Sequence, residues 1–493
     1  MTLPVELNSA TTLLTMLTEG SIGSVELLDL LLERCDRLNP SVNAVVTTDI
    51  EGARIAAKAA DNLPKKQRGL LHGLPMTIKD AYEVVGMTAS CGFSHLAGHR
   101  PVTDADPVGL LRNAGAVFFG KTNLPLAASD HQSYNDLYGT TNNPWDPART
   151  PGGSSGGAAA ALAAGLTPLE LGSDIGGSIR CPSHYCGVYG HKPSYGLVPM
   201  RGHIPPMPGT MTVADLGVGG PMARSSYDLE LALDILTTPI RSESMAWSVR
   251  IPDSRHEQLR NFKVALWADQ SAYPVDSRCL QAMHEYADDL RKLGVSVDES
   301  GRPDLDPVIS DEIYFAMLFA TVSADMPEEA IQATIDAGAS CPADDKSFPA
   351  RIARSMRMGH NQYLQLKEQQ AELRLAWQKF FQNYDLILCP IMPTVAPPHD
   401  HSGQGPAHIP QYSRTLMVDG KPVPYLHGLQ WPGLITVACL PATAVPTGRF
   451  IDGMPMGLQV VAPYLEDRTS IRFAQLVEKE LGAYSFPNDY VSR

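Results

Sequence analysis

Residues 151–157 read Pro151-Gly152-Gly153-Ser154-Ser155-Gly156-Gly157, and residues 174–180 read Asp174-Ile175-Gly176-Gly177-Ser178-Ile179-Arg180. Ser178 follows Ser154 by 24 residues, with an alanine-rich, helix-forming stretch between them. Glycine lets backbone N–H groups approach a ligand closely. A serine hydroxyl becomes a nucleophile once a neighbouring group removes its proton. The two runs together predict an acyl-transfer site.

The segments around these runs alternate between strand and helix signals. An apolar stretch at 75–80 predicts a buried strand, and 263–267, 276–293 and 295–297 form a strand–helix–strand pattern that implies parallel strands. Helical periodicity covers 25–38, where Asn39-Pro40 predicts the end, and 351–382. We predict the α/β class: one large domain whose central mixed, largely parallel sheet is covered by helices on both faces.

Composition limits the classes of function. The chain has 493 residues, of which 44% are hydrophobic and 19% are charged, which excludes a disordered protein. Its formal net charge of −14 argues against nucleic acid or an anionic membrane as a partner. We detect no signal peptide and no apolar run approaching the length of about 20 residues that spans a bilayer. We therefore expect a soluble, cytoplasmic protein, either a monomer or a homodimer.

The cysteines give no sign of a metal centre. Eight are present without CxxC pairs, and Cys181 and Cys186 lack a second pair of ligands nearby in the sequence. A chain of this length needs no disulfides, so buried reduced thiols are the simpler interpretation. Nothing in the sequence calls for a metal or a cofactor.

One stretch matches the phosphate-loop formula GxxxxGK[ST]. It is Gly115-Ala116-Val117-Phe118-Phe119-Gly120-Lys121-Thr122. A phosphate loop needs a flexible turn that opens a helix. Here the middle residues favour a buried strand, and Pro125 follows where the helix should begin. Nucleotide binding is therefore the weaker interpretation.

The run at 153–157 also fits GxSxG, the nucleophile elbow of α/β-hydrolases, with Ser155 as the nucleophile. That alternative needs a strand before the serine and a downstream histidine. The preceding segment is proline-rich rather than strand-like. The candidate histidines, none of which lies in a recognisable motif, are His360, His399 and His427.

A lysine can replace the histidine as the base. Lys79 ends the apolar strand candidate at 75–80, where burial would disfavour its ammonium form and lower its pKa. Taken alone, a lysine at a strand end more often reaches water. Beside two serine clusters, the catalytic interpretation becomes the stronger one.

The chain resembles the amidase signature family. The resemblance is dense from Gly69 to Gly202 and weaker near the C-terminus. Its motifs are Gly73-Leu74-Pro75, Lys79-Asp80, Ala114-Gly115-Ala116, Gly120-Lys121-Thr122-Asn123, Asn143-Pro144-Trp145, the two runs quoted above, Gly190-His191-Lys192-Pro193-Ser194, Leu440-Pro441-Ala442 and Gly457-Leu458-Gln459. The GKTN turn of this family accounts for the phosphate-loop match.

The resemblance implies roles for individual residues. Ser178 is expected to attack the amide carbonyl, Ser154 to relay the proton and Lys79 to act as the final base. The peptide bond between Gly153 and Ser154 is expected to be cis. The oxyanion hole is expected at the backbone N–H groups of Ile175, Gly176, Gly177 and Ser178. Substrate is expected to contact Ser154 and Ala128. Further cavity walls are expected from Tyr134, residues 200–208 and residues 313–319.

The resemblance also implies the reaction. We expect an amidohydrolase that cleaves carbon–nitrogen bonds other than peptide bonds, and the apolar wall candidates favour a neutral, bulky or aromatic amide, anilide or carbamate. The alternative within the family is the glutaminase component of a glutamyl-tRNA amidotransferase complex, which must bind zwitterionic glutamine and dock partner chains. Ile175 argues against it, because many members carry Thr there. Ala158 and Leu126 also depart from common family residues.

The resemblance finally suggests how the chain is divided. We expect a single amidase domain over 1–493, with an N-terminal helical region at 1–65. The signature core is expected at 66–240. The C-terminal α/β part, which carries pocket helices and loops, is expected at 241–493.

Overall fold

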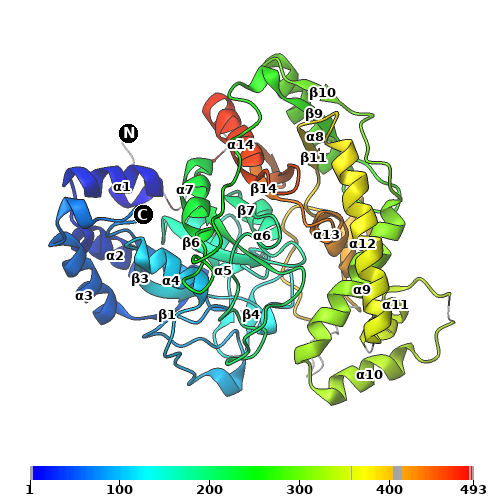
Figure 1. Cartoon of the computed structure of the whole chain (residues 1–493), viewed down its shortest axis with the longest axis horizontal. Coiled ribbons are helices and arrows are strands. Elements are labelled where there is room, and N and C mark those ends of the chain that lie inside the picture. The colour runs from blue at the N-terminus through cyan, green and yellow to red at the C-terminus, as the bar shows by residue number, and fades with distance from the viewer. Residues whose placement is uncertain are drawn as a thin grey trace.

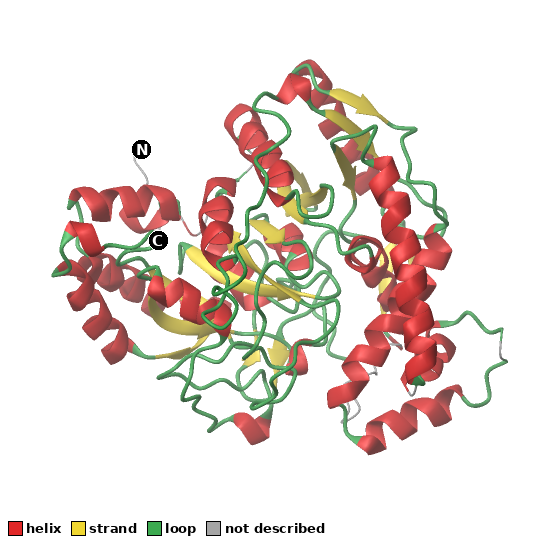
Figure 2. Ribbon diagram, viewed as in Figure 1, coloured by secondary structure: helices red, strands yellow, loops and turns green. Residues whose placement is uncertain are grey.

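The computed structural model of the chain describes residues 4–342, 344–356, 358–403, 413–482, 484–487 and 490. Its largest sheet runs through the middle of the molecule, with helices on the outside (Figures 1 and 2). The strand order is β10-β9-β11-β15-β14-β7-β8-β6. The strands are β6 (Leu169–Asp174), β7 (Tyr189–Lys192), β8 (Val218–Ala223), β9 (Lys263–Leu266), β10 (Ser296–Asp298), β11 (Leu386–Cys389), β14 (Ala442–Ile451) and β15 (Met454–Val461).

The sheet is mixed, as predicted, but it is not largely parallel. Only the β10–β9 and β9–β11 pairs are parallel, and the other neighbours are antiparallel. The βαβ unit at 263–298 is correct but does not represent the whole sheet. The long β14–β15 hairpin turns at Asp452-Gly453, both at positive φ (52° and 76°), which suits a tight hairpin. This hairpin joins antiparallel strands, in contrast to the largely parallel sheet that was predicted.

A smaller sheet holds the lysine-bearing strand. Its order is β1-β3-β2, with β2 (Pro75–Lys79) parallel to β3 (Val117–Thr122), and β1 (Val45–Thr48) antiparallel to β3. β3 contains most of the phosphate-loop match, so this stretch is a buried strand as expected. Thr77 of β2 donates its hydroxyl to Glu170 Oε1 of β6 at 2.6 Å. This contact sets β2 beside β6.

Two groups of helices cover the large sheet. α7 (Ser226–Leu236) packs on α14 (Asp467–Leu481), and both contact the sheet. α5 (Gly156–Ala163) packs on α6 (Arg180–Cys186) and contacts it from the other side. The alanines of α5 are buried, which allows this close packing. The sheet with helices on both faces confirms the predicted fold class.

The remaining helices lie around these two layers. The N-terminal region carries α1 (Ala10–Glu19), α2 (Ser24–Val42), α3 (Ile50–Asp61) and α4 (Asp106–Asn113), at the left of Figure 1. The later helices are α8 (Ser277–Lys292), α9 (Pro307–Val322), α10 (Glu328–Gly338), α11 (Phe348–Met356), α12 (His360–Phe380) and α13 (Gln430–Val437). Short strand pairs are β4 (Tyr134–Asn135) with β5 (Gly139–Thr140), and β12 (Thr415–Val418) with β13 (Lys421–Pro424).

Two helix predictions need correction. α2 continues through Pro40 to Val42, because a proline in the last turn of a helix removes only one terminal hydrogen bond. It ends at Asn43, which is left-handed with φ 53°. The helix predicted over 351–382 is two helices, α11 and α12, and α12 begins after Gly359. The sequence also predicts a long proline-rich loop over 390–412, of which residues 404–412 lie outside the described residues.

One apolar core joins both sheets. It includes Ile78 of β2, Leu171 of β6, Val264 of β9 and Val460 of β15, all fully buried. A second cluster lies between α9, α11, α12 and α13, and Ile175 packs against it. α12 runs alongside α9 at the right of Figure 1. These helices lie over the end of β6, where the second glycine-serine run begins.

One helical segment, Pro307–Asp325, is long and apolar enough to cross a membrane by length and composition. The sequence prediction found no continuous apolar run of that length, and this segment contains Asp311 and Glu312. However, 44% of this segment is buried, and α9 packs against α11, α12 and α13. A core helix of a globular protein passes the same test. We interpret α9 as such a helix.

Candidate active site

The second glycine-serine run is a turn between β6 and α6 that is fastened by Asp174. Asp174 accepts the backbone N–H of Gly177 at 2.9 Å and that of Ile179 at 3.0 Å. Gly177 has φ 101°, and a Cβ there would lie 2.8 Å from Cγ of Pro432. Only glycine meets both conditions without strain. The turn therefore has a defined shape, with Ser178 at its end.

Lys79 is the last residue of β2 and is fully buried. Its Nζ lies 2.7 Å from Ser154 Oγ and 2.9 Å from Ser173 Oγ. The Gly153–Ser154 peptide bond is cis, as the resemblance implies. A lysine from one sheet and a serine from the first run are thus in direct contact.

Burial lowers the pKa of Lys79 to about 7, whereas Cys91, Asp174 and Glu170 act in the opposite direction. The ammonium form loses its hydration inside the protein, so the neutral amine is favoured. A neutral amine has a lone pair that can accept a proton. Lys79 can therefore act as a base near neutral pH, which an exposed lysine cannot do.

Ser154 and Ser178 line one cavity of about 250 Å³, together with Ile175, Gly176 and Ala128. The predicted nucleophile, relay and substrate contacts are therefore brought together. Lys79 lies behind Ser154, out of the cavity. The carbonyl of Ser178 accepts the N–H of Ser155 at 3.1 Å, which ties the two runs to each other.

The predicted oxyanion hole needs one correction. The N–H of Gly177 is directed to Asp174 Oδ1, so it is not available to a substrate oxygen in this structure. Among the described residues, no acceptor is found for the N–H groups of Ile175, Gly176 and Ser178. The buried carboxylate of Asp174 recruits the Gly177 N–H because it needs donors around it.

Solved structures and sequence relatives resemble this chain over nearly its whole length. A family model described as Amidase matches residues 26–471. The chain belongs to the amidase signature family. A glutamyl-tRNA(Gln) amidotransferase subunit from a Roseiflexus strain is 30% identical, covering 94% of each chain, and one from Exiguobacterium sibiricum is 28% identical, covering 96% of this chain and 97% of the relative.

Two solved structures have the same fold. A bacterial aryl acylamidase of the amidase signature family superposes with a TM-score of 0.82 at 22% identity and covers 99% of both chains. A crystal structure described as an amidase has a TM-score of 0.76 at 27% identity and covers 96% of this chain and 100% of its own. With the family established, the protein is an amidohydrolase that acts on carbon–nitrogen bonds of non-peptide amides.

In this amidase, an ion pair fixes the turn that carries Ser178. Arg180 and Asp174 are both fully buried, with Arg180 Nη2 2.8 Å from Asp174 Oδ1. Although burial acts in the opposite direction, the charge of Arg180 holds the pKa of Asp174 well below its usual value. Arg180 also donates to Gln459 Oε1 and Thr436 Oγ1 at 2.9 Å. Arg180 thereby connects this turn to α13 and β15.

Replacing Arg180 with methionine should lower the free energy of unfolding by about 3–5 kcal/mol, because Asp174 would remain buried without its counter-charge. Urea denaturation measures this loss. The matched control is Arg54→Met, since the Arg54–Asp29 pair is exposed and should contribute no more than about 1 kcal/mol. Equal losses in the two variants would contradict the assignment.

The cavity walls are mainly apolar. Residues 200–208 and α9 both contribute, as predicted, through Met200, Pro205, Pro206, Met207, Leu318 and Phe319. Tyr134 does not line the cavity, and that prediction is wrong. Its hydroxyl instead donates to Asp130 at 2.9 Å, behind the cavity surface.

The sequence interpretation assigned no role to two polar cavity residues that are linked to Lys79. Ser173, next to the second run, contacts Lys79, and His203 contacts Ser173, with 2.8 Å between Nε2 and Oγ. Ser173 lies at the end of a buried strand directly before a recognised motif, which is a signal that could have found it. His203 lies in a loop 30 residues later, with no local signal in the sequence.

The rejected alternatives lack their required geometry. Ser155 is fully buried, does not line the cavity, and bonds to the backbone of Ser173. Lys121 of the phosphate-loop match forms a fully buried ion pair with Asp80 at 3.0 Å. Within the described residues, no group of three or more His, Cys, Asp or Glu side chains could hold a metal ion. Cys181 and Cys186 are buried free thiols.

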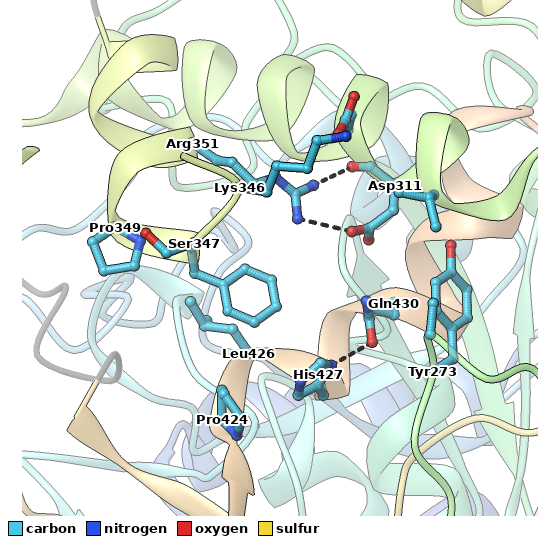
Figure 3. Close-up of a pocket in the computed structure, with 14 residues that line it drawn as sticks. Tyr273, Asp311, Lys346, Ser347, Pro349, Arg351, Pro424, Leu426, His427 and Gln430 are labelled. Carbon is cyan, nitrogen blue, oxygen red and sulfur yellow. Dashed lines mark hydrogen bonds and ion pairs between the residues drawn. The ribbon is translucent and has the colours of Figure 1, made fainter. Parts of the chain in front are cut away.

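A second cavity, of about 390 Å³, lies between α9, α11 and residues 424–430 (Figure 3). Arg351 reaches across it to Asp311, with 2.9 Å between Nη1 and Oδ2. His427 is there, with its ring hydrogen-bonded to Gln430, and it does not line the cavity of Ser154 and Ser178. Leu426 lines both cavities. The cavity contains none of Lys79, Ser154 and Ser178.

Proposed function

We propose that this amidohydrolase works through an acyl-enzyme on Ser178, with Ser154 as the proton relay and Lys79 as the base. The observation that carries the proposal is the 2.7 Å contact between the buried Lys79 Nζ and Ser154 Oγ, beside the cavity that Ser178 also lines. Covalent catalysis divides one difficult hydrolysis into two easier steps.

In the first step, the Ser178 oxygen forms a bond to the amide carbon while its proton moves to Ser154. The proton of Ser154 moves to neutral Lys79, which becomes an ammonium. The carbonyl electron pair moves to oxygen, where the N–H groups of Ile175, Gly176 and Ser178 stabilise it. When the carbonyl re-forms, the C–N bond breaks, and the proton returns through Ser154 to the leaving amine.

In the second step, water attacks the acyl-enzyme through the same relay. Its proton passes by way of Ser154 to Lys79, the ester bond to Ser178 breaks, and the serine regains its proton. The products are the carboxylic acid and the amine, and the enzyme returns to its starting state. No co-reactant other than water is consumed.

We infer that the substrate is a neutral amide with a bulky or aromatic acyl group. The apolar walls from 200–208 and α9 support this, because apolar cavities favour such ligands. We expect carbamates to react as well, since attack on their carbonyl forms an oxyanion in the same place. Ala128 and Ser154 are expected to contact the acyl part. The expected partner of the enzyme is this small-molecule amide, and we expect it to bind neither nucleic acid nor a membrane.

The second candidate is the glutaminase reaction, supported by the relatives named as components of a glutamyl-tRNA(Gln) amidotransferase. Glutamine carries a carboxylate that needs a cation when buried. No lysine or arginine is among the described residues that line the cavity, and Asp130 at its wall is already paired with Arg414 at 2.5 Å. A cavity whose described lining residues include no lysine or arginine favours a neutral amide over glutamine.

A substrate panel tests the choice. The purified protein is assayed with an aryl anilide, the matching primary amide, an aryl carbamate, an ester and L-glutamine, with the Ser178→Ala variant as the blank. We expect kcat/KM for the anilide to exceed that for glutamine by on the order of 100-fold or more, because an unpaired buried charge costs several kcal/mol. Glutamine as the best substrate would overturn the proposal.

The pH dependence of kcat/KM should show an acid limb with a midpoint of about 7. Lys79 must be neutral to accept the proton, and its pKa is lowered to about 7. Activity should therefore rise with pH through this value and level off above it, falling about tenfold for each unit below. A profile that stays flat between about pH 5.5 and 8.5 would contradict the role of Lys79.

A further inference from the structure

His203 ends a chain of hydrogen bonds that begins at the proposed catalytic serine relay. Ser154 Oγ is 2.7 Å from Lys79 Nζ, which is 2.9 Å from Ser173 Oγ. Ser173 Oγ is 2.8 Å from His203 Nε2, and His203 Nδ1 is 2.8 Å from the carbonyl oxygen of Pro205. Four side chains from separate segments are thus connected to one backbone carbonyl.

The carbonyl of Pro205 sets the direction of donation along this series of hydrogen bonds. A carbonyl oxygen only accepts, so Nδ1 of His203 carries the hydrogen. In a neutral imidazole the other nitrogen is then an acceptor. Burial, followed by the charge of Lys79, lowers the pKa of His203 to about 3, so the ring is neutral where the enzyme works. Tyr82, which packs edge-on against the ring at 4.9 Å, holds its plane.

The direction of hydrogen-bond donation determines whether the Ser173 hydroxyl donates to Lys79 or accepts from it. Because Nε2 accepts, the hydroxyl hydrogen of Ser173 points to His203. Its oxygen is then left to accept an N–H from Lys79. The neutral amine has two N–H bonds and one lone pair, so this contact leaves the lone pair free for Ser154. Without the acceptor on His203, the Ser173 hydroxyl could turn and donate to that lone pair, in competition with Ser154.

We propose that His203 is a positioning residue that keeps Ser173 an acceptor and so directs the lone pair of Lys79 to Ser154. The proposal rests on the base role of Lys79 given above. It also explains why a histidine lines the cavity beside Ser154 without being the proton acceptor. His203 acts through Ser173 and Lys79 rather than on the substrate.

The test compares His203→Leu, which has no acceptor, with His203→Gln, whose side-chain oxygen can accept from Ser173. We expect kcat to fall by about 100-fold in the leucine variant, as for a misdirected catalytic group, with a change of only a few-fold in KM. The glutamine variant should recover most of kcat. Equal losses in both variants, or a loss confined to KM, would overturn the proposal.

A double-mutant cycle with Ser173→Ala isolates the coupling. Once Ser173 has no hydroxyl, His203→Leu should lower kcat little further, because the link to Lys79 is already missing. Independent, multiplying effects would overturn the proposal. The matched control is His399→Leu, since His399 also contacts a proline carbonyl, that of Pro147 at 3.3 Å, but does not line the cavity. It should retain full kcat.

Labelling by a fluorophosphonate separates this proposal from the proposed function. A label on Ser178 in the native protein, together with full activity of His203→Leu, would reject the role of His203 alone. A label on Ser173 would reject the proposed function itself, because Ser173 and His203 would then act as a nucleophile and its base. We expect the label on Ser178 and slower labelling in His203→Leu.

Discussion

Ser178→Ala should lower kcat/KM for amide hydrolysis by on the order of 10⁴–10⁶-fold, because the variant cannot form the acyl-enzyme. Ser178 lines the cavity next to the N–H groups of Ile175 and Gly176, and the hydroxyl is lost without disturbing the turn that Asp174 holds. Steady-state assay with the best substrate of the panel measures the loss.

The matched control is Ser155→Ala. Ser155 is the alternative nucleophile of the GxSxG interpretation, and its hydroxyl donates to the carbonyl of Ser173 and accepts the N–H of Ser173, both at 3.3 Å. We expect this variant to keep kcat/KM within about tenfold of the native value, since the two neutral hydrogen bonds that are lost contribute only about 1 kcal/mol each to stability. Near-complete inactivation by Ser155→Ala, with activity retained in Ser178→Ala, would reverse the assignment.

Lys79→Met should lower kcat by about 10²–10⁴-fold, the usual contribution of a general base. Methionine fills a similar volume and has no charge to bury, so the fold should be retained. KM should change little, because Lys79 lies behind Ser154 and does not line the cavity. The acid limb of the pH profile should disappear with the lysine. Stopped assays at several pH values measure both effects.

Lys192→Met is the control for this variant. Lys192 is another fully buried lysine, whose pKa burial lowers to about 8, but its Nζ donates to the carbonyl of Pro193 and it is not a cavity residue. Thermal unfolding of both variants separates loss of fold from loss of base. If Lys79→Met kept full activity, the Ser–Ser–Lys arrangement would not be the catalytic apparatus.

The sequence predicted the residues whose chemistry leaves a local pattern. Ser154, Ser178 and Lys79 lie in motifs, and the structure places Lys79 at the end of a buried strand, as expected. The α/β class followed from alternating periodicities. The strand interpretation of 117–122 was confirmed because its apolar residues favour burial over a phosphate loop.

What the sequence could not predict depends on contacts between distant segments. The pairing of β14 with both β7 and β15 makes the sheet mostly antiparallel, and no local signal encodes that order. The Gly177 N–H is used by Asp174, which only the folded turn reveals. His203 reaches Ser173 from a separate loop, and Tyr134 contacts Asp130 instead of the cavity. Each depends on tertiary geometry.

Fluorophosphonate treatment, followed by mass spectrometry of the modified peptide, reports whether the buried neutral amine of Lys79 activates Ser178 through Ser154. We expect a single adduct on Ser178, absent in Ser178→Ala and formed far more slowly in Lys79→Met. An adduct on Ser155 or Ser173, or unchanged labelling of Ser178 in Lys79→Met, would show that this relay is not the catalytic apparatus.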